Sequence, residues 1–465
     1  MPFSQRRDHS RLLPADPRTR AIATDLYERV AGMPIISPHG HVPPQLLLDD
    51  APFTDAAELF VQKDHYVTRL LHSAGISLES LGVGGAQADP REVWRAFASN
   101  WHLFAGTASG YWLSEELSAF FDVTVDLSAD NADEVFDLVA SHLVTDEFRP
   151  RALFRSFNLE VLATTDDPLS DLAAHRALRE LDLGGRVIPT FRPDAYLDPE
   201  SASFVDRVGA LLRATGEQTS FAGYLAALQA RREYFIANGA VSTDHGVLEP
   251  LTIDLDAAVA ESLFQAALSG TIDADQARTF RAHMLFQMAR MSVEDGLVMT
   301  VHPGVLRNHS TPTYKRFGAD AGHDIPVATT FTQGMRPLLE RFGLEPNLHL
   351  VLFTIDESSF SRELAPLAGF YPSVFVGAPW WFLDAPDSIA RFRAATVETA
   401  GFYKSSGFID DTRAFLSIPA RHDTARRVDS AVLARLVAEE RISLARAERI
   451  ADDLVGAIPR KVFKL

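Results

Sequence analysis

Two closely spaced histidines are the side chains in this sequence best suited to share a metal ion. His39 and His41 follow a short apolar run, residues 33–37. Side chains alternate along an extended segment, so both imidazoles point to the same side and can reach one divalent ion. The alternative interpretation is a pair of hydrogen-bonded structural histidines.

A third histidine and an aspartate also stand where apolar runs end. His302 closes one such run, and Asp411 follows another. An aspartate there could complete a mononuclear site with the first two histidines and leave positions open for a substrate. Asp411 is preferred to its neighbour Asp410 because it forms a D-x-R element with Arg413. Taken alone, His302 could equally be a core histidine, and Asp411 a loop carboxylate paired with Arg413.

Arginines and other polar residues end further apolar runs. Arg192, Arg307 and Arg413 would supply local positive charge on a chain whose formal net charge is −18. A carboxylate ligand needs such a cluster, because guanidinium groups bind carboxylates in a fixed, two-pronged geometry. Asp244 and Trp380 stand at two other run ends. Together these residues predict a site for a small organic acid.

These residues need a scaffold that brings the ends of many strands together. Eight short apolar runs alternate with amphipathic stretches, at residues 33–37, 159–163, 186–190, 239–243, 296–301, 349–354, 374–377 and 407–410. Alternation of this kind is typical of parallel α/β folds, and eight units favour a (β/α)8 TIM barrel, whose active sites lie at the carboxyl ends of the strands. Two doubly wound domains are the alternative, but no Pro/Gly/Ser-rich linker divides the chain.

The same pattern predicts four segments. Residues 1–44 form an N-terminal arm and the first strand, and residues 45–158 a mainly helical insertion after it. Residues 159–416 hold the rest of the barrel. Residues 417–465 read as amphipathic helices that pack against it.

Composition disfavours several other classes of protein. The 465 residues include no cysteine, which excludes disulfides, thiolate metal sites and cysteine nucleophiles. With 62 acidic and 44 basic residues, a nucleic acid or anionic membrane partner is not expected. The first 20 residues lack an apolar signal core, so we expect a cytoplasmic protein. Dinucleotide, serine-hydrolase and Walker signatures are missing from the sequence.

Taken together, the motifs resemble those of the uronate isomerase (glucuronate isomerase) family of the amidohydrolase superfamily. The resemblance covers nearly the whole chain. In chain order its motifs are His39-Gly40-His41, Asp64-His65-Tyr66, residues 153–158, 164–168 and 189–194, Asp244-His245-Gly246, residues 302–308, Trp380-Trp381-Phe382, and residues 411–415.

The resemblance implies a metal-dependent barrel enzyme that interconverts an aldose uronate and its ketose. D-glucuronate with D-fructuronate and D-galacturonate with D-tagaturonate are the expected pairs. His39, His41 and Asp411 would hold one divalent metal ion, zinc fitting best, with His302 either a fourth ligand or a hydrogen-bonding neighbour. The hexuronate would be the partner of a homo-oligomeric enzyme.

Roles for single residues follow from the resemblance as hypotheses. Asp411 would be the general base, Arg413 would stabilise the developing oxyanion, and Tyr66 beside His65 would move protons between the substrate oxygens. The expected substrate-binding residues are Arg192, Arg307, Trp380 and Asp244. A metal-dependent hydrolase such as a lactonase on the same barrel is the competing interpretation, and a sugar-acid binding protein without catalysis is a third.

Overall fold

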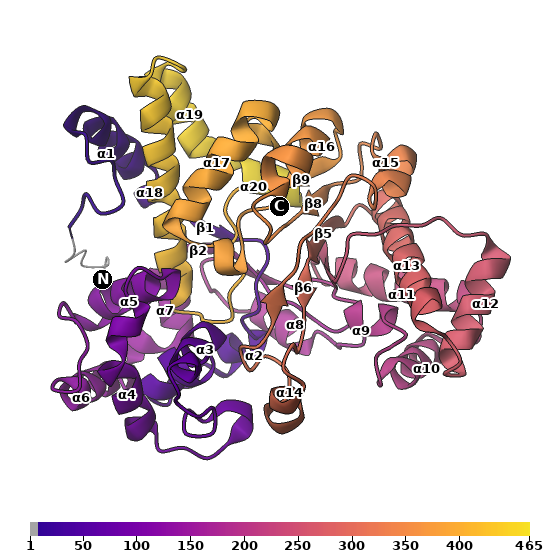
Figure 1. The fold of residues 1–465 in the computed structure, drawn as a ribbon, viewed down its shortest axis with the longest axis horizontal. Helices are drawn as coiled ribbons and strands as arrows, with labels where there is room; N and C mark the ends of the chain where they lie inside the picture. The colour runs from indigo at the N-terminus through magenta and orange to yellow at the C-terminus, as the bar shows by residue number, and fades with distance from the viewer. Residues whose placement is uncertain (1–7) are drawn as a thin grey trace.

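The computed structural model describes residues 8–465, in which short parallel strands at the centre are surrounded by helices (Figure 1). The strands are β1 (Ile35–Ser37), β2 (Leu159–Ala163), β3 (Arg186–Ile188), β4 (Ser242–Val247), β5 (Val298–Pro303), β6 (Val305–Leu306), β7 (Ile325–Pro326), β8 (Leu350–Leu352) and β9 (Val374–Val376). They form two parallel sheets, in the orders β1-β2-β3 and β4-β5-β8-β9, and a small antiparallel pair, β6-β7.

Phe191 joins the two parallel sheets. It lies just beyond β3 and forms parallel bridges with Asp166 on one side and Thr243 on the other. The backbone N–H of Asp244 donates to the carbonyl of Phe191 at 2.9 Å. The strand order therefore continues from β3 into β4 without a gap.

The ring closes on its other side through the segment that follows β9. Ser405 forms a parallel bridge with Val376. Farther along that segment, the N–H of His41 donates to the carbonyl of Thr412 at 2.9 Å. The last segment thus lies between β9 and the extension of β1, and this arrangement is consistent with the (β/α)8 barrel expected from the sequence.

The prediction of an eighth strand at residues 407–410 is wrong, because the structure assigns no strand there. Gly407 has φ +77° and Asp411 has φ +41°, and neither value is compatible with an extended chain. The segment meets its neighbours by single contacts instead of a ladder. Its bend is what turns Asp411 toward the interior.

Six predicted strands lie within two residues of the observed ends, but the fourth was placed too early. Residues 239–243 were predicted, whereas β4 begins at Ser242, because Gly239 takes φ +93° in the turn that follows the preceding helix. The β6-β7 hairpin was not predicted. It forms the base of a loop that carries Arg307.

Helices cover the outside of the barrel. They are α1 (Pro17–Ala31), α8 (Ala173–Arg179), α9 (Asp194–Leu197), α10 (Phe204–Thr215), α11 (Phe221–Ala237), α12 (Ala257–Leu268), α13 (Ala274–Asp295), α14 (Thr311–Phe317), α15 (Arg336–Phe342), α16 (Ala365–Phe370), α17 (Pro386–Ala400), α18 (Ser417–Ala438), α19 (Leu444–Val455) and α20 (Ala457–Phe463). The longest of the helices between strands, α13, starts at a capping box of Asp273 and Gln276 and ends at left-handed Gly296.

A group of helices fills the segment between β1 and β2 and lies to one side of the barrel (Figure 1). It comprises α2 (Pro44–Asp49), α3 (His65–Ser73), α4 (Pro90–Ser99), α5 (Ala108–Phe121), α6 (Ala132–Leu143) and α7 (Pro150–Ser156). Its apolar core includes fully buried Trp94, whose indole N–H donates to the carbonyl of Ala132 at 2.8 Å. The division into domains at residues 44, 158 and 416 stays a prediction.

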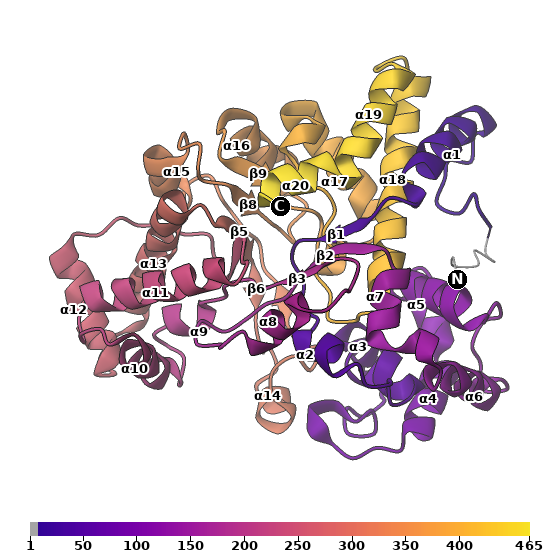
Figure 2. The ribbon, with the colours of Figure 1, turned by 180° about the vertical axis from the view of Figure 1, so that it is seen from behind.

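The C-terminal helix lies against the amino ends of the strands. The Nδ1 of His349, next to β8, is 2.7 Å from the carbonyl of Val462 in α20. The ammonium group of Lys464 donates to the carbonyls of Gly296 and Asn347, both at 2.7 Å. Figure 2 shows α20 beside β8 and β9. The carboxyl ends of the strands, where the predicted site residues stand, face the other way.

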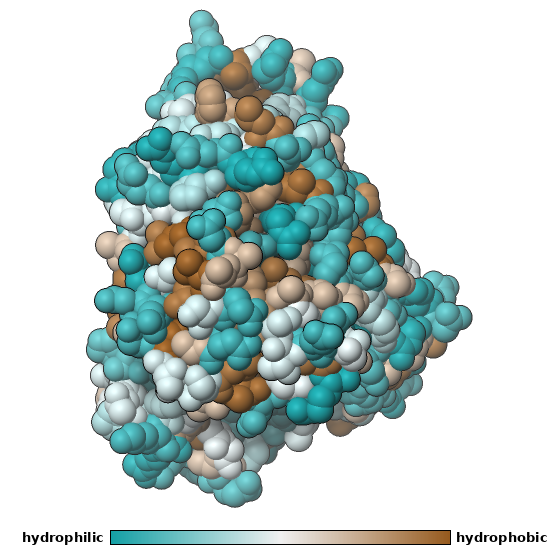
Figure 3. Space-filling view, turned by 90° about the vertical axis from the view of Figure 1, so that its right-hand side faces the viewer, coloured by the Kyte–Doolittle hydropathy of each residue, from teal (hydrophilic) through white to brown (hydrophobic). Residues whose placement is uncertain are grey.

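The face over the helices on the right of Figure 1 is mainly hydrophilic, with separate hydrophobic patches (Figure 3). Exposed large apolar residues in the described chain include Val205, Val259 and Phe370. Scattered residues of this kind are usual on protein surfaces. Among the described helices, none is long and apolar enough to cross a membrane.

Glu116 gives the helical insertion a pH-dependent stability. It lies on α5 and is 4% exposed, and burial raises its pKa to about 8 even though Arg421 lowers it. An unfolded glutamate releases its proton near pH 4.5. Folding therefore takes up a proton between these values. The stability that this proton contributes is complete below the lower pH and lost as pH rises through the upper one.

We expect Glu116→Gln to remove this dependence, because the amide needs no proton. Relative to the unmodified chain, the variant should melt several degrees higher at about pH 9 and within about 1 °C at about pH 5. Differential scanning calorimetry across this range measures the effect. An equal pH dependence in both proteins would contradict it.

Candidate active site and metal centre

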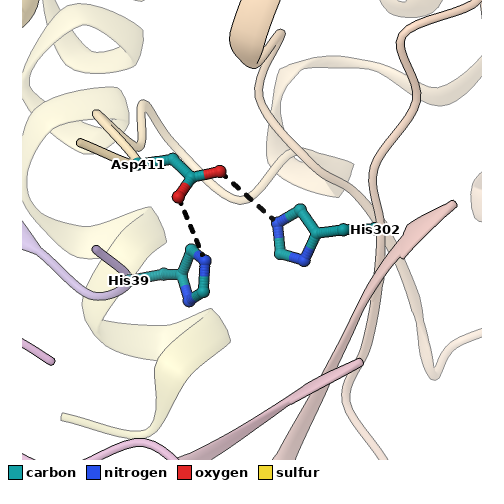
Figure 4. A group of neighbouring side chains, drawn as sticks. All are labelled: His39, His302 and Asp411. Carbon is teal, nitrogen blue, oxygen red and sulfur yellow. Dashed lines mark ion pairs between the residues drawn. The ribbon is translucent and has the colours of Figure 1, made fainter. Parts of the chain in front are cut away.

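Three side chains from distant parts of the chain converge at the carboxyl ends of the strands. His39, His302 and Asp411 each place a potential ligand atom within 4.8 Å of the other two (Figure 4). The Nε2 atom of His39 is 3.3 Å from Oδ1 of Asp411, and that of His302 is 4.0 Å from Oδ2. The His39 and His302 rings stack with centroids 4.7 Å apart.

His41 contacts the same carboxylate from the solvent side. Its Nε2 atom lies 3.0 Å from Oδ1 of Asp411, and its side chain is 26% exposed, against 1% for His39. The hydrogen bond between the backbones of His41 and Thr412 holds these two segments together. The structure thus brings together the predicted ligands His39, His41 and Asp411, with His302 beside them.

The register of β4 and β5 explains how His302 is oriented. Asp244 pairs with Thr300, so His302, two residues farther along β5, faces the same side of the sheet. The Nδ1–H of His302 donates to Oδ1 of Asp244 at 2.8 Å. This bond leaves Nε2 as the atom with a free lone pair, directed at the cluster. Asp244 therefore acts here through His302.

The donor set fits a divalent cation. His302 Nε2 is buried and has no hydrogen-bond partner among the described residues, and the buried Oδ1 of Asp411 faces the Nε2 atoms of His39 and His41. Burial would raise the pKa of Asp411, but His39 and His41 hold it well below the usual value. Conversely, burial would lower the pKa of His39, but Asp244 and Asp411 raise it. The cluster thus attracts positive charge and offers imidazole nitrogen and carboxylate oxygen to hold it.

A cavity of about 400 Å³ opens above this cluster. Most of the predicted site residues line it: His41, His65, Tyr66, Arg192, Arg307, Trp380, Asp411 and Arg413. His39, His302 and Asp244 are buried and do not line it. The cavity is large enough for a six-carbon sugar acid in its open-chain form.

The three predicted arginines each have a carboxylate partner. Arg192 lies 3.3 Å from Asp244 and 3.0 Å from Asp194. Arg307 pairs with Asp324 at 2.8 Å, and Arg413 makes long contacts of 3.4 Å with Asp320. The cavity wall is therefore lined with guanidinium groups held by aspartates, of which Asp320 and Asp324 belong to none of the sequence motifs.

Tyr66 and His65 open helix α3 at the cavity wall. Asp64 caps this helix through the N–H of Tyr66 at 2.7 Å. The indole N–H of Trp381 donates to Nε2 of His65 at 3.2 Å, so the imidazole accepts and is neutral in this arrangement. Burial and the charge of Arg413 lower the pKa of His65, and burial raises that of Tyr66. Tyr66 is thus a phenol at neutral pH.

The loop after β9 supplies an aromatic wall. Trp380 contacts the His302 ring edge-on at 4.8 Å, and its indole N–H is buried without a partner among the described residues. Trp381 has φ +54°, a strained value for a bulky residue, and stacks on Phe382 at 4.7 Å. The strain turns these aromatic rings toward the cavity.

Arg421 is a cavity residue that the sequence analysis missed. It lies on α18, is 2% exposed, and pairs with Asp384 at 2.8 Å. Its guanidinium lies 3.6 Å from the Trp112 ring centroid and 5.8 Å from that of Tyr66. The sequence shows Arg421 eight residues after Arg413, but residues 417–465 were predicted only to pack against the barrel.

Comparisons with known proteins agree with this geometry. A family model described as glucuronate isomerase matches residues 18–463. This chain belongs to the glucuronate isomerase family. Uronate isomerases from Corynebacterium efficiens and Rhizorhabdus wittichii are 51% and 52% identical to it over 98% of both chains. The hydrolase interpretation is not favoured at this identity and coverage.

Solved structures of the glucuronate isomerase family share the whole fold. The glucuronate isomerase from Caulobacter crescentus matches with a TM-score of 0.96 and 48% identity, covering 98% of this chain and 97% of that one. The uronate isomerase from Thermotoga maritima matches with a TM-score of 0.93 and 28% identity, covering 98% and 99%. The family fold thus holds despite substantial sequence change.

The cluster predicts one bound divalent ion per chain, and loss of that ion in Asp411→Asn. An amide is a weaker ligand than a carboxylate and cannot balance the charge. Metal analysis of dialysed proteins by mass spectrometry measures the content. Asp410→Asn is the matched control, because the neighbouring carboxylate bonds His422 at 3.0 Å instead. Full metal content in Asp411→Asn would exclude this carboxylate as a ligand.

Proposed function

We propose that this chain interconverts an aldose hexuronate and its 2-ketose, with D-glucuronate and D-fructuronate or D-galacturonate and D-tagaturonate as the pairs. One observation carries the proposal: a cavity sized for a hexuronate is lined by arginines and lies above a carboxylate and imidazole cluster. Membership of the glucuronate isomerase family supports it.

The reaction requires two coupled proton movements. A base removes the proton from C2 of the aldose, and the carbonyl at C1 becomes the oxyanion of an enediolate. A proton then returns to C1, while the proton on the C2 oxygen moves to the C1 oxygen. No oxidant or reductant is consumed, because one carbon is oxidised as its neighbour is reduced.

We assign the general base at C2 to Asp411. Its low pKa keeps it ionised, and it is the carboxylate of the cluster that lines the cavity. His39, His41 and Asp411, with His302 as the fourth candidate, would hold a divalent ion, and Zn²⁺ suits this mixture of nitrogen and oxygen ligands. When bound, such an ion supplies a Lewis acid that polarises the carbonyl oxygen.

Tyr66 and Arg413 complete the chemistry on the cavity side. The phenol of Tyr66 is protonated at neutral pH, so it can donate to one substrate oxygen and accept from the other. His65 stacks on the Tyr66 ring at 4.5 Å and would assist it from this position. Arg413 would stabilise the enediolate oxyanion by its fixed charge.

Three other cavity residues would bind the substrate. Arg192 and Arg307 would bind the hydroxyl and carboxylate groups, and the indole of Trp380 would pack against the carbon chain. Asp244 sets the position of Arg192 as well as that of His302. The cytoplasmic location and the homo-oligomeric state expected from the sequence stay predictions.

Proton NMR of the Zn²⁺-supplemented protein in D₂O tests the proposal. We expect ketose signals from D-glucuronate, D-galacturonate or both, with deuterium at the exchanging carbon in proportion to solvent access. Protein stripped of metal is the control for uncatalysed exchange. If neither sugar gives a ketose while metal is bound, the isomerase proposal is overturned and a lactone panel becomes the next test.

Tyr66→Phe should lower kcat about 10²- to 10⁴-fold, the usual contribution of a positioned acid or base, and leave metal content unchanged. The reason is that only the hydroxyl is lost from a ring that packs against His65 and Phe382. Steady-state kinetics measure the effect. Tyr403→Phe is the control, since Tyr403 is 49% exposed and bonds Asp453. An unchanged kcat would remove Tyr66 from the mechanism.

A further inference from the structure

Arg69 and Arg421 are cavity arginines for which the mechanism above has no use, and of the two only Arg69 lacks a carboxylate partner among the described residues. It lies on α3, three residues after Tyr66 and four after His65, so it shares their face of the helix. All three residues line the cavity above the metal cluster. Arg69 therefore faces the same space as the residues assigned to proton transfer.

Arg69 differs from the other cavity arginines in its partners. Arg192, Arg307, Arg413 and Arg421 are each within 4.0 Å of an aspartate. Among the described residues, Arg69 has no carboxylate partner and no hydrogen bond. It instead stacks over the Phe382 ring, with its guanidinium carbon 4.4 Å from the centroid. Its positive charge is thus available to a ligand.

The surroundings of Arg69 fix its direction. A Cβ atom added to Gly322 would lie 2.7 Å from the Cβ of Arg69 and 3.2 Å from the carbonyl of His65. The loop that carries Asp320 and Asp324 therefore packs directly on the stem of Arg69. The loop thus fixes the base of the Arg69 side chain, and the Phe382 ring lies under its guanidinium.

The electrostatics favour an anion at this position. Burial lowers the pKa of Arg69, with Tyr66 the group that opposes the effect and no acidic residue contributing. A half-buried guanidinium without a counter-ion loses hydration, and here the Phe382 ring is what it gains in return. A bound carboxylate compensates for the lost hydration, because it accepts two parallel N–H hydrogen bonds from the guanidinium. The strongly acidic chain offers an anionic substrate few other free cations in this cavity.

We propose that Arg69 joins Arg192 and Arg307 in substrate binding by making a direct contact with the carboxylate of the hexuronate. The inference rests on the proposed function, since it names the group that recognises that substrate. Arg192 is held by Asp244 next to His302, close to the cluster floor, whereas Arg69 lies beside Phe382 on the outer wall. The proposal thus places C1 and C2 above the cluster and the carboxylate beside Arg69.

Two non-reacting ligands, L-gulonate and D-glucitol, allow carboxylate binding by Arg69 to be measured without turnover. L-gulonate is D-glucuronate with C1 reduced to an alcohol, so it keeps the carboxylate and cannot isomerise. D-glucitol lacks the carboxylate as well. Isothermal titration calorimetry of the metal-loaded protein should show that Arg69→Gln weakens L-gulonate binding about 10- to 100-fold, the value of a charge-assisted bidentate contact. Binding of D-glucitol should be the same in both proteins.

Kinetics give a second measurement. Arg69→Gln should raise KM for the hexuronate by a similar factor, change kcat by less than about threefold, and flatten the fall of kcat/KM with added salt. Arg69→Lys should recover part of the affinity, because it restores the charge without the two-pronged geometry. Metal content and melting temperature should match those of the unmodified chain.

Arg91→Gln is the matched control. Arg91 also lies in the helical insertion and over an aromatic ring, 4.5 Å from the Phe136 centroid, but it is paired with Asp133 and Asp137 outside the cavity. It should leave L-gulonate binding unchanged. Equal L-gulonate affinity in Arg69→Gln and the unmodified chain, with isomerase activity present, overturns the role of Arg69 alone. If the unmodified chain neither binds L-gulonate nor isomerises hexuronates, the proposed function fails as well.

Discussion

Two buried carboxylates at the carboxyl ends of the strands impose the central constraint on this structure. Asp244 has Arg192 and His302 as partners, whereas Asp411 faces only imidazoles. An ionised carboxylate inside a protein is costly unless a positive charge lies nearby. The excess negative charge raises the pKa of His39, which favours a protonated imidazole. A bound divalent cation would neutralise more of this charge. The parallel barrel makes the imbalance possible, because its strand ends bring together residues that are hundreds of positions apart.

The rest of the site divides into a rigid floor and walls made by additions to the barrel. The floor residues stand on strand extensions tied by backbone hydrogen bonds, as His41 is to Thr412. The walls come from α3 of the helical insertion, from the loop between β6 and β7, from the loop after β9 and from the start of α18. A substrate bound in the cavity therefore touches several segments whose relative positions are set by packing. Arg421, fixed by Asp384 and stacked on Trp112, joins the α18 wall to the helical insertion.

The sequence predicted the floor better than the walls, and the reason is geometric. His39 and His302 could be identified because residues at the carboxyl ends of barrel strands gather at one end of the barrel, and Asp411 because it forms a D-x-R element with Arg413. The bond between Asp244 and His302 depends on the register of β4 and β5, which a single sequence does not contain. The orientations of Arg69 and Arg421 depend on how each helix is rotated about its axis. The eighth strand was predicted from apolar residues alone, whereas the left-handed φ of Gly407 and Asp411 prevents it.

The protonation states of the wall explain why this site suits an isomerase better than a hydrolase. A hydrolase must activate one water and protonate one leaving group, whereas an isomerase must carry a proton between two neighbouring oxygens of the same molecule. Burial keeps Tyr66 protonated, so it serves as a donor that can also accept, and not as a nucleophile. His65 accepts from the indole N–H of Trp381 and is a neutral imidazole, so it adds no charge beside Arg413. Tyr66 and His65 are neutral, and the charge of Arg413 is fixed. The charge that develops on the enediolate during the reaction therefore meets a positive charge that is already in place.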